Sequence, residues 1–330
     1  MFSLSRLPLF IIGVFMKLVA LQKIDEAAVR AVVPDIEFVH TSRDQLLDVV
    51  TDADILIGSP GNLWEDVLKV SPKLRWVHVS SAGVDRMVSP AFLESEITLT
   101  CAKGDVVGPL LAEHAFALML ALTRGIALCV RDGRWNRHEG AAGKLVFEVG
   151  GKTMGLVGFG GVGQHLARMA KAFDMDVIAL RRAVVGDEPE GVTVWGNERF
   201  DDLLAQSDVV VVSVPDTPDT RGMFDKDAFA KMKKSAFLIT VGRGNTVDTD
   251  ALVDALQKGE IAGAGLDVVD PEPLPDEHPL WRMRNVIITP HIAGNAPERA
   301  GRNQALVLDN LKRFAQGDAL MSAVDKSAGY

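Results

Sequence analysis

A strand, a glycine-rich turn and a helix follow one another directly between residues 154 and 173, and this order constrains the fold more than any other feature. The strand is apolar, and the helix repeats its apolar residues at helical spacing. A turn of this kind lets the backbone approach a pyrophosphate, which the helix N-terminus attracts. The unit therefore predicts a parallel α/β domain that binds a dinucleotide. The turn has the GxGxxG pattern and consists of Gly158, Phe159, Gly160, Gly161, Val162 and Gly163.

Short apolar segments alternate with helical patterns along the rest of the chain, as is typical of parallel sheets. We therefore predict an α/β protein with two Rossmann-like, doubly wound parallel-sheet domains and an interdomain cleft. The first group of expected strands is residues 17–21, 36–40, 55–58, 76–79 and 97–100. The second group is residues 154–157, 177–180, 208–214, 236–241, 262–268 and 286–289.

The composition of the 330 residues argues against several classes of function. A net charge of −9 without a basic run predicts no attraction to nucleic acid or to an anionic membrane surface. Two cysteines without CxxC spacing, and histidines without an HxxxH or HExxH pattern, predict neither a disulfide nor a metal site. The apolar runs at 7–16 and 109–123 are too short for a membrane span, and the first lacks a clean signal-peptide cleavage site. We expect a cytoplasmic protein.

Three loops in the last third of the chain, each after an expected strand, carry one cation, one carboxylate and one imidazole. These residues are Arg243, Glu272 and His291. Ligands bind at the carboxyl ends of the strands in an open α/β sheet, so the three side chains are expected to converge there. Each residue alone has an ordinary alternative, namely a surface ion pair, a solvated acid and a turn residue, respectively. Their occurrence together with a dinucleotide turn favours an active site.

The order of these motifs resembles the D-isomer-specific 2-hydroxyacid dehydrogenases, in particular the glyoxylate and hydroxypyruvate reductases, from about Met16 onward. The resemblance implies reduction of a small 2-oxo acid to a D-2-hydroxy acid by hydride transfer. It implies that His291 donates a proton to the ketone oxygen, that Glu272 keeps the imidazole protonated, and that Arg243 binds the substrate carboxylate. Backbone N–H groups in the loop Ser81-Ala82-Gly83 would hold the same carboxylate.

The resemblance also implies how the chain is divided into domains. Residues 1–15 are expected to be an N-terminal extension, and residues 104–291 to be the dinucleotide-binding domain. Residues 16–103 and 292–330 are expected to form a discontinuous substrate-binding domain, because the C-terminal helix returns to the first domain in the resembled family. We expect the protein to be a homodimer.

The cofactor preference depends on the residues that follow the strand at 177–180. An acid is expected there for the ribose 2′-hydroxyl of NAD, but this chain has Arg181 and Arg182. A guanidinium suits a 2′-phosphate, so NADP is the expected cofactor and NAD the alternative. Arg181 has alternatives of its own, which are stacking on the adenine and exposure to solvent. The resemblance implies that Asp267 accepts a hydrogen bond from the nicotinamide carboxamide. Further cofactor contacts are implied at Val214, Pro215, Thr220, Val241, Gly242, Arg243, His291 and Gly294.

Other functions remain compatible with the sequence. Formate and phosphite dehydrogenases share the expected fold, and the corepressors called C-terminal-binding proteins resemble the same family while acting as dinucleotide-sensing binding modules. His278 is the alternative proton donor, because it follows Asp276 and Glu277 in the loop that carries Glu272. His114 and His165 lie on expected helices and are predicted to be structural.

Overall fold

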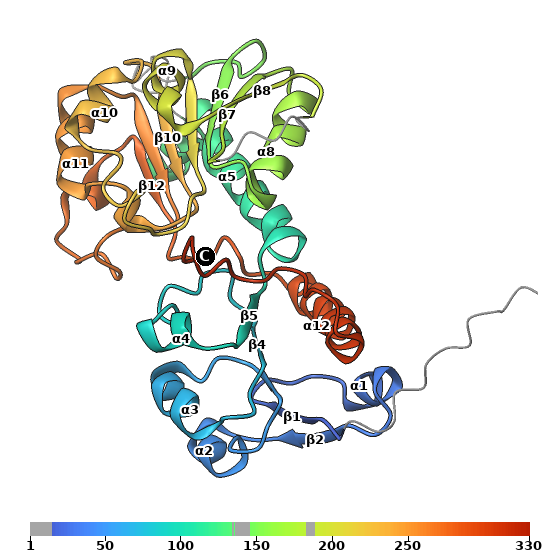
Figure 1. Ribbon diagram of the computed structural model, residues 1–330. Helices are drawn as coiled ribbons and strands as arrows, with labels where there is room; N and C mark the ends of the chain where they lie inside the picture. Colours follow the sequence, from blue (N-terminus) through green and yellow to red (C-terminus); the bar gives the residue numbers. More distant parts are fainter. Residues whose placement is uncertain (1–14, 134, 136–145, 183–188) are drawn as a thin grey trace, which may run out of the picture. The chain divides into compact units, whose positions relative to one another are not determined.

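The computed structural model describes residues 15–133, 135, 146–182 and 189–330, and it consists of two compact units (Figure 1). The first unit contains the described residues up to Ala102 together with Gly301–Tyr330, and the second contains Lys103–Ala300. The second division falls inside helix α12 (Glu298–Gln316), whereas it was expected between residues 291 and 292. The functions assigned to the two domains stay predictions.

The first unit has a five-stranded parallel sheet in the order β2-β1-β3-β4-β5. All five strands were expected from the sequence, and each end differs from the expectation by at most one residue. The strands are β1 (Lys17–Ala20), β2 (Glu37–His40), β3 (Ile55–Ile57), β4 (Trp76–Val79) and β5 (Thr98–Cys101). The helices are α1 (Glu26–Val32), α2 (Leu46–Val49), α3 (Trp64–Val70), α4 (Pro90–Glu94) and most of α12, with 3₁₀ turns at Arg43–Gln45 and Gly61–Leu63.

Helices cover both faces of this sheet. Val29 of α1 and Val307 of α12 pack with Trp76 on one face, and residues of α2, α3 and α4 pack on the other. The central strands β3 and β4 are therefore buried on both sides, which explains why they read as continuous apolar segments. Asp25 caps the N-terminus of α1, and Ser89 caps that of α4, so both helices begin where the sequence offers a side-chain acceptor.

The second unit has a seven-stranded parallel sheet in the order β12-β11-β10-β9-β6-β7-β8. The chain starts this sheet at β6, adds β7 and β8 on one side, and then adds β9 to β12 on the other. The reversal beside β6 is the switch point at which α/β sheets bind ligands. The strands are β6 (Thr153–Val157), β7 (Asp176–Leu180), β8 (Val192–Trp195), β9 (Val209–Val212), β10 (Phe237–Thr240), β11 (Gly263–Leu266) and β12 (Val286–Ile288).

Strand β8 was not expected from the sequence, whereas the other six strands were. Its four residues, Val192–Trp195, lie at the edge of the sheet, are only partly buried, and are followed by Gly196. A short edge strand has no continuous apolar segment, so the sequence pattern is weak there.

The helices of the second unit also form two layers (Figure 1). Residues of α5 and α8 share one apolar cluster with one face of the sheet, and residues of α9, α10 and α11 pack on the other face. The helices are α5 (Gly108–Thr123), α6 (Ile126–Asp132), α8 (Gly161–Ala172), α9 (Phe200–Gln206), α10 (Lys226–Lys231) and α11 (Thr249–Lys258). The 3₁₀ turns are Gly104–Val106, Asn197–Arg199, Gly244–Thr246 and Pro279–Arg282.

Helix α5 is a core helix, and its nearly uniform apolar sequence fits this position. Its buried side chains include Phe116, Leu118 and Met119, which pack in the cluster between α8 and the sheet. In the described part of the chain, no single helix has both the length and the apolar character to cross a membrane, although α5 and α6 pass that test together as a bent pair.

Candidate active site

His291 and Glu272 form a hydrogen-bonded pair beyond the carboxyl ends of β12 and β11. Nδ1 of His291 lies 2.9 Å from Oε2 of Glu272, and the other carboxylate oxygen accepts from the N–H of Val269 at 3.2 Å. A carboxylate accepts only, so Nδ1 donates and Nε2 is the ring nitrogen left for a ligand. Among the described residues, none forms a hydrogen bond with this Nε2. Both side chains are partly exposed, at 52% for His291 and 39% for Glu272.

The loop that carries His291 is held by Asp267, which follows β11 and is 2% exposed. The Asp267 carboxylate accepts hydrogen bonds from the hydroxyl of Thr289 at 2.7 Å and from the N–H groups of Ile292 at 3.0 Å and Ala293 at 2.9 Å. The N–H of His291 donates to the backbone carbonyl of Asp267 at 2.9 Å. Asp267 therefore fixes both ends of the loop. Its contact with a nicotinamide carboxamide stays a prediction.

Arg243 lies in the loop after β10, close to the loop after β9. Its Nη1 donates to the carbonyl of Gly242 at 2.8 Å, and its own carbonyl accepts from the Thr246 hydroxyl at 2.7 Å. Arg221 chiefly, and then Asn245 and Arg243, lower the pKa of the Asp216 carboxyl. Gly242 packs so closely that a Cβ atom there would lie 2.6 Å from the carbonyl oxygen of Val214. The loops after β9 and β10 therefore converge at Arg243, as expected for neighbouring parallel strands.

The loop after β9 is a compact turn that contains three of the predicted cofactor contacts, Val214, Pro215 and Thr220. The Thr220 hydroxyl donates to the carbonyl of Pro215 at 2.6 Å and accepts from the N–H of Thr217 at 2.9 Å. Of the remaining predicted contacts, Val241 is buried beside Arg243, and the carbonyl of Gly294 accepts from Arg299 at 3.2 Å.

The glycine turn lies between β6 and α8, and it fits an anionic group. Gly160 is the N-cap of α8 and provides no side chain, so the first N–H groups of the helix, from Gly161 onward, are not capped. A Cβ atom at Gly160 would meet nothing within 4 Å, whereas one at Gly163 would lie 2.5 Å from the carbonyl oxygen of Gly158. The turn is thus open toward a ligand at Gly160 and tightly packed at Gly163. Phe159 is 3% exposed and packs in the core, and Val162 packs partly against it, so this turn offers mainly its backbone.

Arg181 and Arg182 lie directly after β7, next to the end of β8. The N–H of Arg181 donates to the carbonyl of Trp195 at 2.9 Å, and the guanidinium of Arg199 lies 3.8 Å above the Trp195 ring. Arg181 is partly buried and Arg182 is exposed. Both occupy the position where the residue that contacts the ribose is expected, one strand away from the glycine turn.

The loop Ser81-Ala82-Gly83 belongs to the first unit and follows β4. The Ser81 hydroxyl donates to the carbonyl of Gly83 at 2.8 Å, and the Ser81 carbonyl accepts from the N–H of Ala102 at 3.0 Å. Among the described residues, none accepts a hydrogen bond from the N–H groups of Ala82 and Gly83. The loop therefore has backbone donors for a carboxylate, and its role in the site stays a prediction.

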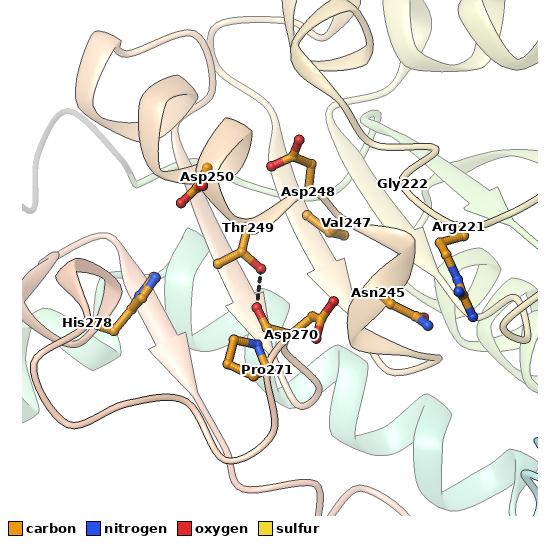
Figure 2. A pocket seen from close by; sticks show the side chains of 10 residues that line it. All are labelled: Arg221, Gly222, Asn245, Val247, Asp248, Thr249, Asp250, Asp270, Pro271 and His278. Carbon is orange, nitrogen blue, oxygen red and sulfur yellow. Dashed lines mark hydrogen bonds between the residues drawn. The ribbon is translucent and has the colours of Figure 1, made fainter. Parts of the chain in front are cut away.

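His278 lies apart from the pair formed by His291 and Glu272. It caps the 3₁₀ turn Pro279–Arg282, with the N–H of Leu280 3.4 Å from its Nδ1. It also lines a cavity of about 650 Å³ together with Arg221, Thr249 and Asp270 (Figure 2). Neither His291 nor Glu272 lines this cavity. His278 stays the alternative prediction for the proton donor.

Three of the other histidines, His78, His114 and His165, have hydrogen-bond partners in the described part of the chain, and His40 is exposed. His165 on α8 lies 3.0 Å from Asp105, and His78 is buried between Thr100 and Asn303. His114 on α5 lies 2.8 Å from Thr289, so it contacts the loop of His291, which the sequence did not indicate. His138 lies outside the described residues. In the described part of the chain, no three or more His, Cys, Asp and Glu side chains are arranged to hold a metal ion.

A parallel sheet with a glycine-rich turn at its switch point, and an imidazole paired with a carboxylate at the same edge, are the features expected of a dinucleotide-dependent dehydrogenase. The chain belongs to the D-isomer specific 2-hydroxyacid dehydrogenase family, because the profile described as the NAD binding domain of that family matches residues 116–293. It is thus an NAD(P)-dependent oxidoreductase that acts on the CH–OH group of D-2-hydroxy acids.

The chain is also similar in sequence and in structure to individual 2-hydroxyacid dehydrogenases. The chain is 37% identical over 294 residues to the glyoxylate reductase of Thermococcus litoralis, with 86% of this chain and 87% of the relative covered. It is 32% identical over 289 residues to the D-3-phosphoglycerate dehydrogenase of Archaeoglobus fulgidus, with 86% of this chain but 54% of the relative covered. The structure of an NADPH-dependent glyoxylate/hydroxypyruvate reductase from Sinorhizobium meliloti, in complex with NADP and sulfate, matches with a TM-score of 0.79, 26% identity, and coverage of 96% of this chain and 100% of that one.

Proposed function

We propose that this protein reduces a small 2-oxo acid, of the glyoxylate or hydroxypyruvate type, to the D-2-hydroxy acid, and that His291 donates the proton. The observation that carries this proposal is the 2.9 Å contact between His291 and Glu272 at the carboxyl edge of the sheet that also carries the glycine turn. The names of the Thermococcus and Sinorhizobium relatives support the substrate class.

The side chains at this edge can perform the steps that the reaction requires of the protein. The glycine turn after β6 would hold the dinucleotide, whose nicotinamide would supply the hydride for the ketone carbon. His291 donates a proton from Nε2 to the ketone oxygen, while the Glu272 carboxylate stabilises the imidazolium through Nδ1. In the reverse direction the neutral imidazole accepts the proton of the hydroxy acid. The guanidinium of Arg243 is proposed to bind the substrate carboxylate through charge-assisted hydrogen bonds. The N–H groups of Ala82 and Gly83 are proposed as further donors to it.

NADP is the cofactor that the two arginines after β7 favour. Arg181 and Arg182 follow β7, where a carboxylate would bind the 2′-hydroxyl of NAD and would repel a 2′-phosphate. An arginine pairs with a phosphate through charge-assisted hydrogen bonds. The Sinorhizobium relative is described as NADPH-dependent, which supports the same preference.

Steady-state assays with a panel of 2-oxo acids test the substrate class. Glyoxylate, hydroxypyruvate, pyruvate, phenylpyruvate and 3-phosphohydroxypyruvate are each assayed with NADPH and with NADH. The last substrate is included because of the D-3-phosphoglycerate dehydrogenase relatives. We expect the highest kcat/KM with glyoxylate or hydroxypyruvate and NADPH. A higher kcat/KM with the phosphorylated substrate, or no turnover of any 2-oxo acid, would contradict the proposal. The second result is the one expected of a dinucleotide-sensing binding protein.

Substitution of Arg181→Asp tests the cofactor preference. A hydrogen bond to a charged group contributes about 1.5 to 3 kcal/mol, so the ratio of kcat/KM for NADPH to that for NADH should fall by about tenfold to a hundredfold. The control is Arg199→Gln, because Arg199 lies on the Trp195 ring and forms an ion pair with Asp202 at 2.7 Å. If the ratio of kcat/KM for NADPH to that for NADH is the same in the Arg181 variant as in wild type, Arg181 does not bind the 2′-phosphate.

The homodimer and the cytoplasmic location stay predictions. Size-exclusion chromatography with light scattering measures the first directly, and a mass of about twice the 35.6 kDa of one chain is the expected result.

A further inference from the structure

A continuous chain of hydrogen bonds connects helix α5 to the loop of His291. Nε2 of His114 lies 2.8 Å from Oγ1 of Thr289, and the Thr289 hydroxyl lies 2.7 Å from Oδ1 of Asp267. The hydroxyl has one hydrogen, which goes to the carboxylate, so Oγ1 accepts from His114. Nε2 of His114 must therefore carry a proton. It also lies 3.4 Å from the Asp267 carboxylate itself.

This chain ends on the residue that determines where His291 lies. Asp267 holds the N–H groups of Ile292 and Ala293 with its carboxylate and the N–H of His291 with its carbonyl. His291 has a φ of 53°, in the left-handed region that non-glycine residues rarely adopt. Such a conformation persists only where the surroundings hold it. The loop therefore needs the restraint that Asp267 provides.

His114 is an unusual residue at its position on α5. The neighbouring residues of the helix that face the core are apolar, and its side chain is 20% exposed. A largely buried imidazole is destabilising unless it forms a hydrogen bond, and the Thr289 hydroxyl supplies the partner. The adjacent Glu113 is exposed and lies outside this network. The helix thus presents one polar donor to the loop from its buried side.

We propose that His114 is a positioning residue for the proton donor, and that it acts through Thr289 and Asp267 to hold residues 289–293 in the conformation in which His291 contacts Glu272. The inference rests on the proposed role of His291. It extends that role to a side chain that lies 177 positions earlier in the sequence (291 − 114) and that forms its hydrogen bond with Thr289, not with His291.

Four variants of the full-length protein separate positioning from a general effect on folding. His114→Leu removes the donor, and His114→Gln keeps a side-chain N–H at a similar reach. Thr289→Val removes the hydroxyl while keeping the shape, and Glu113→Gln is the matched control on the same helix. For each variant, kcat of glyoxylate reduction, the dissociation constant of NADPH and the melting temperature are measured. The ring signals of His291, among seven histidines, are recorded by NMR without cofactor and assigned with His291→Asn.

We expect His114→Leu and Thr289→Val each to lower kcat by about tenfold, the effect of one lost hydrogen bond. The double variant should also have a kcat about tenfold below that of wild type, and not about a hundredfold below it. Both substitutions break the same chain of hydrogen bonds, so their effects should not add. His114→Gln should recover kcat to within about threefold of wild type, and NADPH binding should change by less than about twofold. The His291 ring signals should shift in His114→Leu and Thr289→Val and stay in place in His114→Gln and Glu113→Gln.

Several results would overturn the inference. These are a His114→Leu variant as fast as Glu113→Gln, a His114→Gln variant as slow as His114→Leu, additive losses in the double variant, and His291 ring signals that do not move. The NMR measurement also separates this inference from the proposed function. If wild type reduces no 2-oxo acid, or if His291→Asn keeps full turnover, the proposed function fails, while the ring signals still show whether His114 holds the loop.

Discussion

The orientation of the His291 imidazole depends on one carboxylate, that of Glu272. Since the pair is joined by a hydrogen bond between a ring N–H and a charged oxygen, replacing the carboxylate by an amide removes the charge but keeps much of the shape. Glu272→Gln should therefore lower kcat/KM for reduction by about tenfold to a hundredfold, with little change in the melting temperature. The control is Glu277→Gln in the same loop, where Glu277 is exposed and pairs with Arg282. Equal kcat/KM of the two variants would contradict the proposed role of Glu272 in the reaction.

His78 provides a pH-dependent contribution to stability in the first unit. It is fully buried between Thr100 at 2.9 Å and Asn303 at 3.0 Å, and burial lowers its pKa below the ordinary value of 6.5, although the hydrogen bond to Asn303 opposes this. Below pH 6.5, His78 binds a proton in the unfolded chain but stays neutral in the folded chain. This contribution to stability is therefore complete above pH 6.5 and is lost as the pH falls from there toward the lowered pKa of the folded protein.

The variant His78→Gln tests this sign, because its side chain stays neutral and can still form hydrogen bonds. We expect the free energy of unfolding of wild type to fall more steeply than that of the variant between about pH 7 and about pH 5. Urea unfolding of both proteins across this range is the measurement. Parallel curves would show that His78 does not contribute to the pH dependence.

At the scale of elements, different glycines of the turn before α8 are needed for packing and for cofactor binding. A Cβ at Gly163 would overlap the carbonyl oxygen of Gly158, whereas a Cβ at Gly160 would point into open space. Gly163→Ala should therefore lower the melting temperature by several degrees, as expected for a strained core substitution of about 1 to 3 kcal/mol. Gly160→Ala should leave the melting temperature unchanged and weaken NADPH binding by about tenfold or more. Calorimetry of both variants decides this, and a similar loss of stability in both would contradict it.

The elements show which parts of the fold can be predicted from sequence. Strands β3, β4 and β9 are buried on both faces, so their apolar segments are continuous and their bounds were expected closely. The edge strand β8 is partly exposed and was missed. Arg243, Glu272 and His291 were identified because each follows a strand, and the structure brings Glu272 and His291 into contact.

The contacts that support the site could not be predicted in the same way. His114 and Thr289 are 175 positions apart, and His78 and Asn303 are 225 positions apart. A local pattern contains no information about which residues face each other across a packed helix and sheet. His114 was expected to be structural because its own helix explains its position, and only the packed structure shows its hydrogen bond to the loop of His291.

At the scale of the whole molecule, each of the two units carries some of the predicted site residues. The second unit contributes the glycine turn, the arginines after β7, Arg243, and the pair of His291 and Glu272, all from the carboxyl side of one sheet. The first unit contributes the loop Ser81-Ala82-Gly83 at the carboxyl end of β4. In the proposed reaction, the proton passes through one residue of the second unit, His291.

The most direct test is the turnover number of His291→Asn in glyoxylate reduction, measured with the dissociation constant of NADPH and compared with His278→Asn. Loss of a general acid should lower kcat by about a hundredfold to ten-thousandfold while cofactor binding changes much less. The His278 variant should keep most of its activity, because His278 lines a cavity that neither His291 nor Glu272 lines. If His278→Asn abolishes turnover while His291→Asn stays active, the proton donor is His278 and the proposed mechanism is wrong.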